Sequence, residues 1–574
     1  MRKLGIHIIA SLTVIAFFAS CSGIDKMKKN APTVSYTVKP TVLETHAGNV
    51  DVAIDVKFPE KYFDKKVQIE ATPVLVYEGG ETAFPSKKYQ GESVQGNDKA
   101  ISYLNGGTDS YKGSAPYNDK MRVADLVIRI KGTKGDKSQM FDDIKIAQGV
   151  NATSTLIRDQ DAMAAYAKDN FQRIIPTSKE AEILFMISQA AVRGTELKKE
   201  EIAAIKAFVA EAQAAENINL KGVAVSAYAS PDGKVDFNTK LASKREGSTQ
   251  DYLKKEFKKD KVTEAEGEGF YALKNTPEDW DGFKALMEAS TIQDKELILR
   301  VLSMYTDPEV REKEIKNMSA TYKTIAKDIL PKLRRSKIAV NAELVGKSDE
   351  QILELAQSNP AALNVEEILY AGSLTADVAK KEAIYSAAYS QFASDFRTAN
   401  NYAAALINQG KLDQAAPVIA KANELKANEP VVQNNLGAIA LKQGDYKKAE
   451  ELFGAAAGVG AELDNNLGII ALHKADYENA VKYFGASTEC NAALAKILAG
   501  KAEAALATLN ANTVETGFKY YLKAICGVRM AENDQMFSSL TKAGELDAAW
   551  KSYAKKDMEF VKFFEDAAFK AAIQ

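Results

Sequence analysis

Histidine and cysteine, the residues that most often carry metal or nucleophile chemistry, are few and scattered in this sequence. They are His7, His46, His473, Cys21, Cys490 and Cys526. No two of them have the spacing of a zinc site or of a Cys–His nucleophile pair. We therefore predict no metal, no cofactor and no catalytic residue. Whether Cys490 and Cys526 form a disulfide or stay free is left open.

Cys21 is the cysteine whose neighbours suggest a modification. The chain begins with Met1-Arg2-Lys3, continues with a mostly apolar run over residues 4–18, and reaches Cys21 through Ala19-Ser20. The run is too short to span a bilayer comfortably, so residues 1–20 are predicted to be a signal peptide. The boundary resembles the lipobox of bacterial lipoproteins, with Phe18 in place of the usual leucine, which implies that Cys21 carries lipid. The alternative is an ordinary signal peptide; residues 21–33 are predicted to be a polar, lipidated tether.

A β domain is expected over residues 34–150. Apolar and polar residues alternate along Val52, Ile54 and Val56, and again along Leu126, Ile128 and Ile130. This period of two is typical of strands with one buried face, and glycine-rich turns separate the runs. We predict a β-sandwich-like domain that acts as a docking or structural module.

The region 179–345 alternates strand and helix patterns. Strand-like runs at 182–187, 223–228, 262–268 and 337–344 alternate with amphipathic helices, and residues 275–331 form a long helical insertion before the last strand. We therefore predict a central α+β domain.

One motif in this region resembles the core of the OmpA-like C-terminal domain. The matching positions are Ala227-Tyr228-Ala229-Ser230-Pro231-Asp232-Gly233, then Asn238, Leu241 and Arg245, and the closing run 333–340 is also similar. In that family an aspartate and an arginine 15 positions apart hold the zwitterionic end of diaminopimelate in peptidoglycan. The resemblance therefore implies peptidoglycan binding through Ser230, Asp232, Asn238 and Arg245.

Ser230, which precedes Arg245 by 15 positions, stands where that family has its aspartate. A serine hydroxyl offers no charge to an ammonium group. Asp232 in the same turn can supply the carboxylate, or the fold is retained only for packing. Both interpretations stay open.

The region 364–574 repeats itself. Asn435, Gly437, Ala449 and Phe453 recur 31 residues later as Asn466, Gly468, Ala480 and Phe484, and Asn401 precedes Asn435 by 34 residues. The pattern resembles the tetratricopeptide repeat, which implies an all-α solenoid whose concave surface binds a protein partner.

Composition narrows the function. The chain of 574 residues has 75 basic and 77 acidic side chains, and this balance argues against nucleic-acid binding. The order of modules resembles exported lipoproteins of the Bacteroidetes group. It implies a non-enzymatic lipoprotein on the periplasmic face of the outer membrane, linking that membrane, through peptidoglycan or directly, to a protein assembly. Alternatives are an accessory of the type IX secretion machinery, a glycan-binding surface lipoprotein, and an enzyme acting on glycan.

Overall fold

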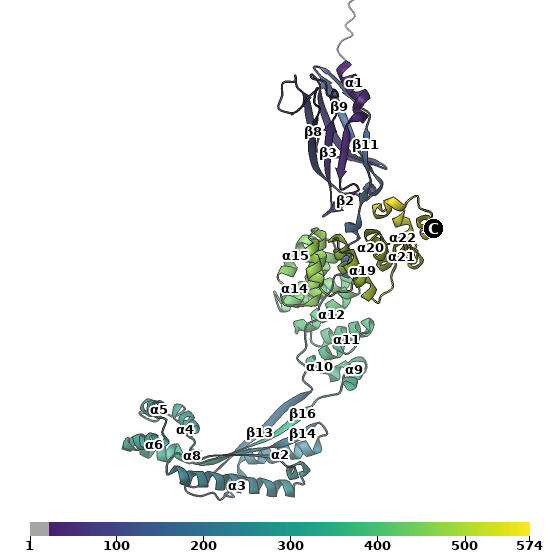
Figure 1. Cartoon of the computed structure of the whole chain (residues 1–574). Helices are drawn as coiled ribbons and strands as arrows, with labels where there is room; N and C mark the ends of the chain where they lie inside the picture. Colours follow the sequence, from purple (N-terminus) through teal and green to yellow (C-terminus); the bar gives the residue numbers. More distant parts are fainter. Residues whose placement is uncertain (1–21) are drawn as a thin grey trace, which may run out of the picture. The chain divides into compact units, whose positions relative to one another are not determined.

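The computed structural model describes residues 22–574. It forms two compact units (Figure 1): residues up to 168 together with 377–574 make the first, and residues 169–376 make the second. The predicted signal peptide and Cys21 lie outside the described residues. The first unit is thus discontinuous in sequence, and the second is inserted into it.

Two β-sheets build the domain between residues 35 and 151. One sheet contains β1 (Ser35–Lys39), β2 (Leu43–His46), β3 (Asn49–Phe58), β8 (Gly107–Pro116) and β12 (Val150–Asn151). The other contains β4 (Gln68–Tyr77), β5 (Gly80–Ala83), β6 (Lys87–Gly91), β7 (Lys99–Ile101), β9 (Asp125–Lys134), β10 (Lys137–Met140) and β11 (Ile144–Gln148). Alternate residues of β3 are buried, as the sequence pattern predicts, and both sheets contribute to one core.

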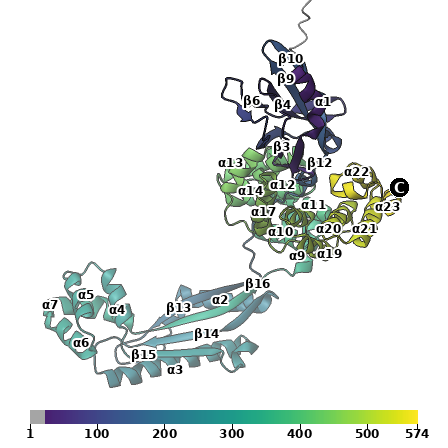
Figure 2. The same cartoon turned by 45° about the horizontal axis from the view of Figure 1, so that its top comes forward.

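The predicted tether is wrong from Ser22 onward, because this stretch is folded. Residues 22–30 form α1 (Ser22–Asn30), which lies against the β domain (Figure 2) and is followed by the 3₁₀ turn Ala31–Thr33. Ile24, Met27 and Ala31 are buried in the core of that domain. Their spacing of three and four residues places them on one helix face. The lysines between them make the average composition of the segment polar, so composition alone does not reveal this apolar stripe.

The second unit is built on a four-stranded sheet in the order β13 (Ile174–Leu184), β16 (Arg335–Val345), β14 (Ile218–Tyr228) and β15 (Tyr271–Thr276). Only β14 and β15 are parallel neighbours. The helices α2 (Glu200–Ala214) and α3 (Val235–Lys259) pack on one face of the sheet and share a core with it. The expected alternation of strands and helices is present, while the family assignment stays a prediction.

The strand expected at 262–268 is misplaced. Residues 263–266 form a 3₁₀ turn, and the strand is β15, which begins at Tyr271. Val262 is 2% exposed and packs into the core beneath the sheet, but it is not part of a strand. Four consecutive residues of β15, 272–275, are exposed, so this edge strand lacks the alternation on which the prediction relied.

The long insertion is helical, as expected, and has its own small core. Its helices are α4 (Trp280–Glu288), α5 (Lys295–Met304), α6 (Pro308–Asn317), α7 (Ser319–Asp328) and α8 (Leu330–Leu333). After β16 the unit ends with α9 (Asp349–Ser358) and α10 (Val365–Ser373). Residues 364–376, which the sequence placed with the repeats, therefore belong to the second unit.

The rest of the chain is an all-helical array. After α11 (Val378–Gln391) come five pairs of helices: α12 (Phe396–Asn408) with α13 (Leu412–Leu425), α14 (Pro430–Lys442) with α15 (Tyr446–Gly454), α16 (Ala461–His473) with α17 (Tyr477–Phe484), α18 (Cys490–Leu498) with α19 (Ala502–Ala511), and α20 (Gly517–Arg529) with α21 (Asn533–Leu546). Two short helices, α22 (Ala549–Ala554) and α23 (Ala567–Ala572), close the chain.

Glycines let the paired helices approach closely. A Cβ on Gly437 would lie 2.5 Å from the Phe453 ring, and one on Gly468 would lie 2.7 Å from the Phe484 ring. These are the positions at which the sequence repeats, so the repeat pattern reflects helix packing. The array is a solenoid of repeated helix pairs.

Candidate functional site

The surface predicted to bind a partner is occupied by the chain itself. Residues 157–168, which we call the strap, connect the β domain to the second unit. They run along the first helices of successive pairs, α12, α14, α16 and α18, through hydrogen bonds to each of these helices. The strap is extended apart from the 3₁₀ turn Asp159–Asp161.

Four asparagines, one on each of α12, α14, α16 and α18, hold the strap by its backbone, and Asn408 at the end of α12 bonds both backbone groups of Ala164 in the same way (2.9 and 3.1 Å). In each case the side-chain Oδ1 accepts a hydrogen bond from the N–H of one strap residue, and Nδ2 donates to the C=O of the same residue. The pairs, with the two distances, are Asn401 with Ala167 (2.7 and 3.0 Å), Asn435 with Ala165 (2.7 and 2.8 Å), Asn466 with Met163 (2.8 and 2.8 Å) and Asn491 with Arg158 (3.1 and 2.9 Å). We call these four residues the clamp asparagines. Each carboxamide therefore hydrogen-bonds the N–H and the C=O of one strap residue, as the backbone of a neighbouring β-strand would.

A second asparagine precedes three of the clamp asparagines and completes the network. These are Asn400, Asn434 and Asn465, and each donates to a strap carbonyl and to the clamp asparagine beside it. Consecutive repeats are also linked, because Asn435 donates to Asn400 at 2.9 Å. All of these side chains are buried, so each bond forms away from water, where an unmade one is costly.

The strap side chains fit the repeats as closely as its backbone does. Ala162, Ala164 and Ala165 are each 3% exposed, so only small side chains fit at these positions. Tyr166 stacks on Tyr385 of α11, with ring centres 5.3 Å apart.

Asp159 of the strap is held by two further side chains. It accepts hydrogen bonds from the Tyr446 hydroxyl at 2.8 Å and from His473 Nε2 at 2.6 Å. The strap is thus bound through polar and apolar contacts over four consecutive repeats.

The β domain also contacts the repeats directly. His46 Nδ1 lies 2.6 Å from the Tyr477 hydroxyl. Asn151 and Thr153 donate to the Glu559 carboxylate at 2.9 and 2.7 Å, and Arg529 forms an ion pair with that carboxylate. The β domain, the strap and the repeats therefore form one unit.

The sequence contains a signal for the clamp beyond the repeat pattern itself. Asn401, Asn435 and Asn466 were recognised as repeat positions without a role. Asparagine is unfavourable inside helices because its side chain competes for backbone hydrogen bonds. Asn-Asn pairs in mid-helix at the repeat spacing, together with an alanine-rich segment elsewhere, indicate side chains that bind an extended backbone.

Three of the four predicted peptidoglycan-binding residues lie together after β14. The Ser230 hydroxyl donates to Asp232, and Asn238 donates to the Ser230 carbonyl at 3.2 Å. Arg334, for which the sequence pattern predicts no role, approaches Ser230 at 3.3 Å and pairs with Asp232 at 3.4 Å. The Asp232 carboxylate thus already has an intramolecular cation.

Arg245 is fully buried and bonded to the backbone. Its guanidinium donates to the carbonyls of Gln189 (3.0 Å), Tyr228 (2.8 Å) and Met186 (3.3 Å). Burial lowers the pKa of Arg245 to about 10. These bonds tie α3 to the ends of β13 and β14, so in this structure Arg245 acts as a packing residue beside the motif.

The helical insertion begins against the same loop. The Asp279 N–H donates to the Ala229 carbonyl at 3.1 Å, and Arg335 pairs with the Asp279 carboxylate at 2.9 Å. Asp279 is 4% exposed. The start of the insertion and the motif loop are therefore joined at the end of β14.

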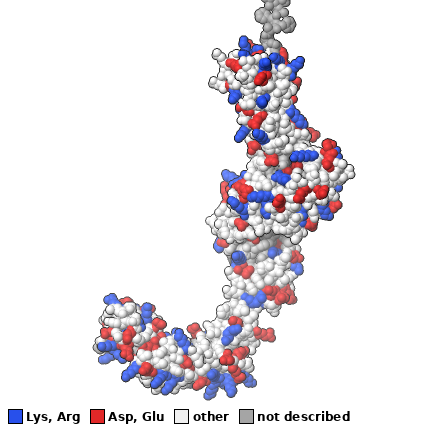
Figure 3. Space-filling view, in the orientation of Figure 1, with Lys and Arg blue, Asp and Glu red and all other residues white. Residues whose placement is uncertain are grey.

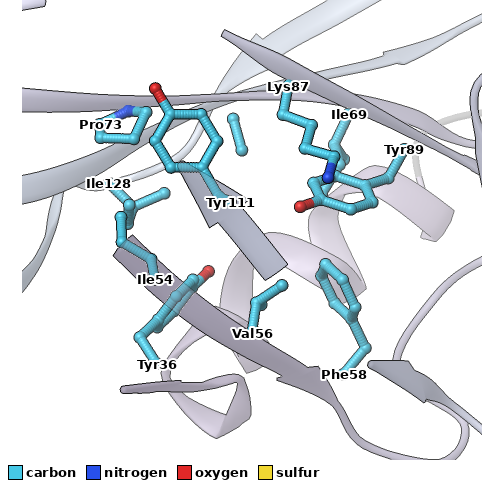
Figure 4. Close-up of a pocket in the computed structure, with 11 residues that line it drawn as sticks. Tyr36, Ile54, Val56, Phe58, Ile69, Pro73, Lys87, Tyr89, Tyr111 and Ile128 are labelled. Carbon is cyan, nitrogen blue, oxygen red and sulfur yellow. The ribbon is translucent and has the colours of Figure 1, made fainter. Parts of the chain in front are cut away.

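A pocket in the β domain offers little chemistry. It lies between the two sheets, has a volume of about 30 Å³, and is lined by Tyr36, Tyr89, Tyr111 and Lys87 together with apolar side chains (Figure 4). Burial raises the pKa of the Tyr111 hydroxyl, which donates to the Pro85 carbonyl at 2.8 Å. No carboxylate lines the pocket, and its volume suits a water molecule rather than a substrate.

Within residues 22–574, no group of His, Cys, Asp and Glu side chains is arranged to hold a metal ion. Cys490 and Cys526 are free thiols, and burial raises their pKa values to about 11 and 12. Across the same range no helix is both long and apolar enough to cross a bilayer.

Several solved structures resemble parts of this chain. YrrB, described as a tetratricopeptide repeat protein with an unusual peptide-binding site, is 20% identical over 30% of this chain and 97% of its own, with a TM-score of 0.24. A tetratricopeptide repeat protein from Parabacteroides merdae is 15% identical over 37% of this chain and 91% of its own, at 0.27. PilF from Pseudomonas aeruginosa is 13% identical over 38% and 100%, at 0.28. No protein-family model and no curated protein sequence matches the chain.

Proposed function

We propose that this protein is a non-enzymatic scaffold of the cell envelope, anchored by lipid on Cys21 to the periplasmic face of the outer membrane. Its first unit is the fixed body, and its second unit is a module inserted into that body for contact with protein or peptidoglycan. The strap bound by the clamp asparagines carries this proposal, because it turns the β domain and the repeats into one body that can bear a load between membrane and partner.

The strap also changes where a protein partner is expected to bind. The four clamp asparagines already bond the strap, so a partner cannot use the same donors and acceptors unless the strap leaves. We therefore place the protein partner on exposed surfaces of the repeats or on the second unit.

Peptidoglycan stays the proposed ligand of the second unit in a narrower form. Arg245 is bonded to three carbonyls, so the charged groups left to meet a ligand are those of Asp232 and Arg334, whose side chains are 15% and 12% exposed. A diaminopimelate end would have to exchange with the Asp232–Arg334 pair, its ammonium taking the carboxylate and its carboxylate taking the guanidinium. No contact in the structure favours type IX secretion or glycan capture over this proposal.

Cell fractionation tests the proposed lipid anchor on Cys21. Cys21→Ser should move the protein from the membrane to the soluble periplasmic fraction, because the acceptor of the lipid is removed. Cys490→Ser is the matched control, since it removes a thiol from the repeats and should leave the protein in the membrane. Cys21→Ser protein that stays in the membrane fraction would reject lipid anchoring.

Capture from detergent-solubilised envelopes tests the scaffold. The full chain and Asn533→Ala, which changes an exposed asparagine of the repeats, should retain the same proteins. Asn435→Ala with Asn466→Ala should retain fewer, because the β domain and the repeats are no longer held in one geometry. An unchanged set after the double substitution, or turnover of glycan by the purified chain, would argue against the scaffold.

A further inference from the structure

The helix α1 leaves no room for a flexible spacer after Cys21. Ser22 is already its first residue, and Ile24 and Met27 are 3% and 1% exposed. Gly23 lies beside Asp64 and Lys134, since a Cβ placed on it would be 2.6 Å from the Asp64 carboxylate and 2.8 Å from the Lys134 ammonium. Cys21 is the next residue in sequence, so no spacer residue separates it from a helix that packs on the β domain.

The strand registers show which end of the domain this is. Phe58, at the end of β3, pairs with Gly107 of β8, and β9 ends at Lys134, beside Gly23. The loops 59–66, 102–106 and 135–136 therefore lie at the end where α1 begins, and we call them, with Ser22–Gly23, the anchor end. At the other end, β2 and β12 lead to the contacts with the repeats.

An exposed leucine projects from the anchor end. Leu104 is 60% exposed on the tight turn Ser102–Gly106, which is closed by a hydrogen bond of 3.0 Å from Gly106 N to Ser102 O. The turn is joined to the 59–66 loop, because Lys61 N donates to Tyr103 O at 2.7 Å. Leu104 therefore shares a face with the start of α1.

We propose that the anchor end lies on the lipid surface, with Leu104 in the interface between headgroups and acyl chains. This inference rests on the proposed lipidation of Cys21. A lipid attached one residue before α1 brings the anchor end to the bilayer, because no spacer separates the lipid from the folded β domain. Tethering raises the local concentration of the face at the membrane, so a single apolar side chain is enough to keep it in contact.

The charges at this end make the contact independent of anionic lipid. Lys134 pairs with Asp64 at 3.4 Å, and Lys65 approaches Glu92 at 3.8 Å. Figure 3 shows basic and acidic side chains interspersed on the visible face of the β domain. Paired charges leave little net attraction for anionic headgroups, so the lipid on Cys21 and Leu104 carry the contact.

The test places an environment-sensitive fluorophore at position 104 of the full lipidated chain. Leu104→Cys is made in a Cys490→Ser background, where the remaining thiol, Cys526, is fully buried. The matched control is Val514→Cys, because Val514 is a 61% exposed apolar residue in the repeats. In phosphatidylcholine vesicles the probe at 104 should shift to the blue and be quenched by headgroup-labelled lipid, while the probe at 514 should stay aqueous.

Two further measurements separate the possible failures. A flexible Gly/Ser spacer inserted between Cys21 and Ser22 should leave the protein in the membrane but return the probe at 104 to water. Mass spectrometry of the purified protein reports whether Cys21 carries lipid. Lipidated protein with an aqueous probe at 104 overturns this inference alone, and protein without lipid overturns both the inference and the proposed anchor.

Discussion

The asparagines inside the repeat helices have the most specific role of any residues in this molecule. Asn435 is fully buried, and its carboxamide bonds both backbone groups of Ala165. Asn401, Asn435 and Asn466 can be recognised from the sequence as repeat positions, but their role cannot, because the strap they bind lies more than 230 residues away in the chain. Arg245 can likewise be recognised from its position in the motif, but the three carbonyls that its guanidinium bonds cannot be predicted from the sequence.

Asn435→Ala should destabilise the strap site by about 1–3 kcal/mol, because the buried Ala165 N–H loses its acceptor, while the Ala165 C=O keeps the hydrogen bond from Asn400 at 3.2 Å. Hydrogen exchange measures this directly: the Ala165 amide should lose most of its protection while amides in β3 keep theirs. The control Asn533→Ala changes an exposed asparagine and should leave both unchanged. Full protection of Ala165 in the Asn435→Ala variant would show that the clamp does not hold the strap.

Among the secondary-structure elements, those with regular periodicity were predictable. The alternation along β3 follows from burial on one face, and the repeat spacing of α14 and α16 follows from close packing that buries most residues of each helix; sequence records both patterns directly. The failures have a common cause: α1 hides a narrow apolar stripe among lysines, β15 is an edge strand with exposed residues, and the strap has no period. In each case the partner surface, rather than the local pattern, decides the structure.

Gly437→Ala should destabilise the array by about 1–3 kcal/mol, because the added methyl overlaps the Phe453 ring and forces α14 away from α15. Gly454→Ala is the control, since nothing lies within 4 Å of a Cβ there and alanine favours the helix. Thermal unfolding of the full chain should show a lower midpoint for the first variant and an unchanged or higher midpoint for the second. Equal midpoints would mean that this close approach of the helices does not matter.

At the scale of the whole molecule, the chain comes back to the first unit after it has formed the second. It leaves the β domain through the strap, builds the second unit, and comes back to form the repeats that hold the strap. The sequence predicted a β domain, an α+β domain and a helical array in the correct order. It could not predict that the first and third form one unit, because that depends on contacts between residues far apart in sequence. The proposed function depends on this unit: a scaffold needs a body that keeps its shape when its modules are loaded.

A single cut tests this organisation most directly. A protease site inserted between Lys168 and Asp169 divides the chain into a fragment that ends with the strap at Lys168 and a fragment of residues 169–574. After cleavage, the two fragments should elute together in size-exclusion chromatography under native conditions and separate in denaturant, because the clamp asparagines and the Glu559 contacts hold them without a covalent link. In a chain that also carries Asn435→Ala and Asn466→Ala they should separate under native conditions. If the cut fragments of the otherwise unaltered chain come apart without denaturant, the strap does not hold the first unit together.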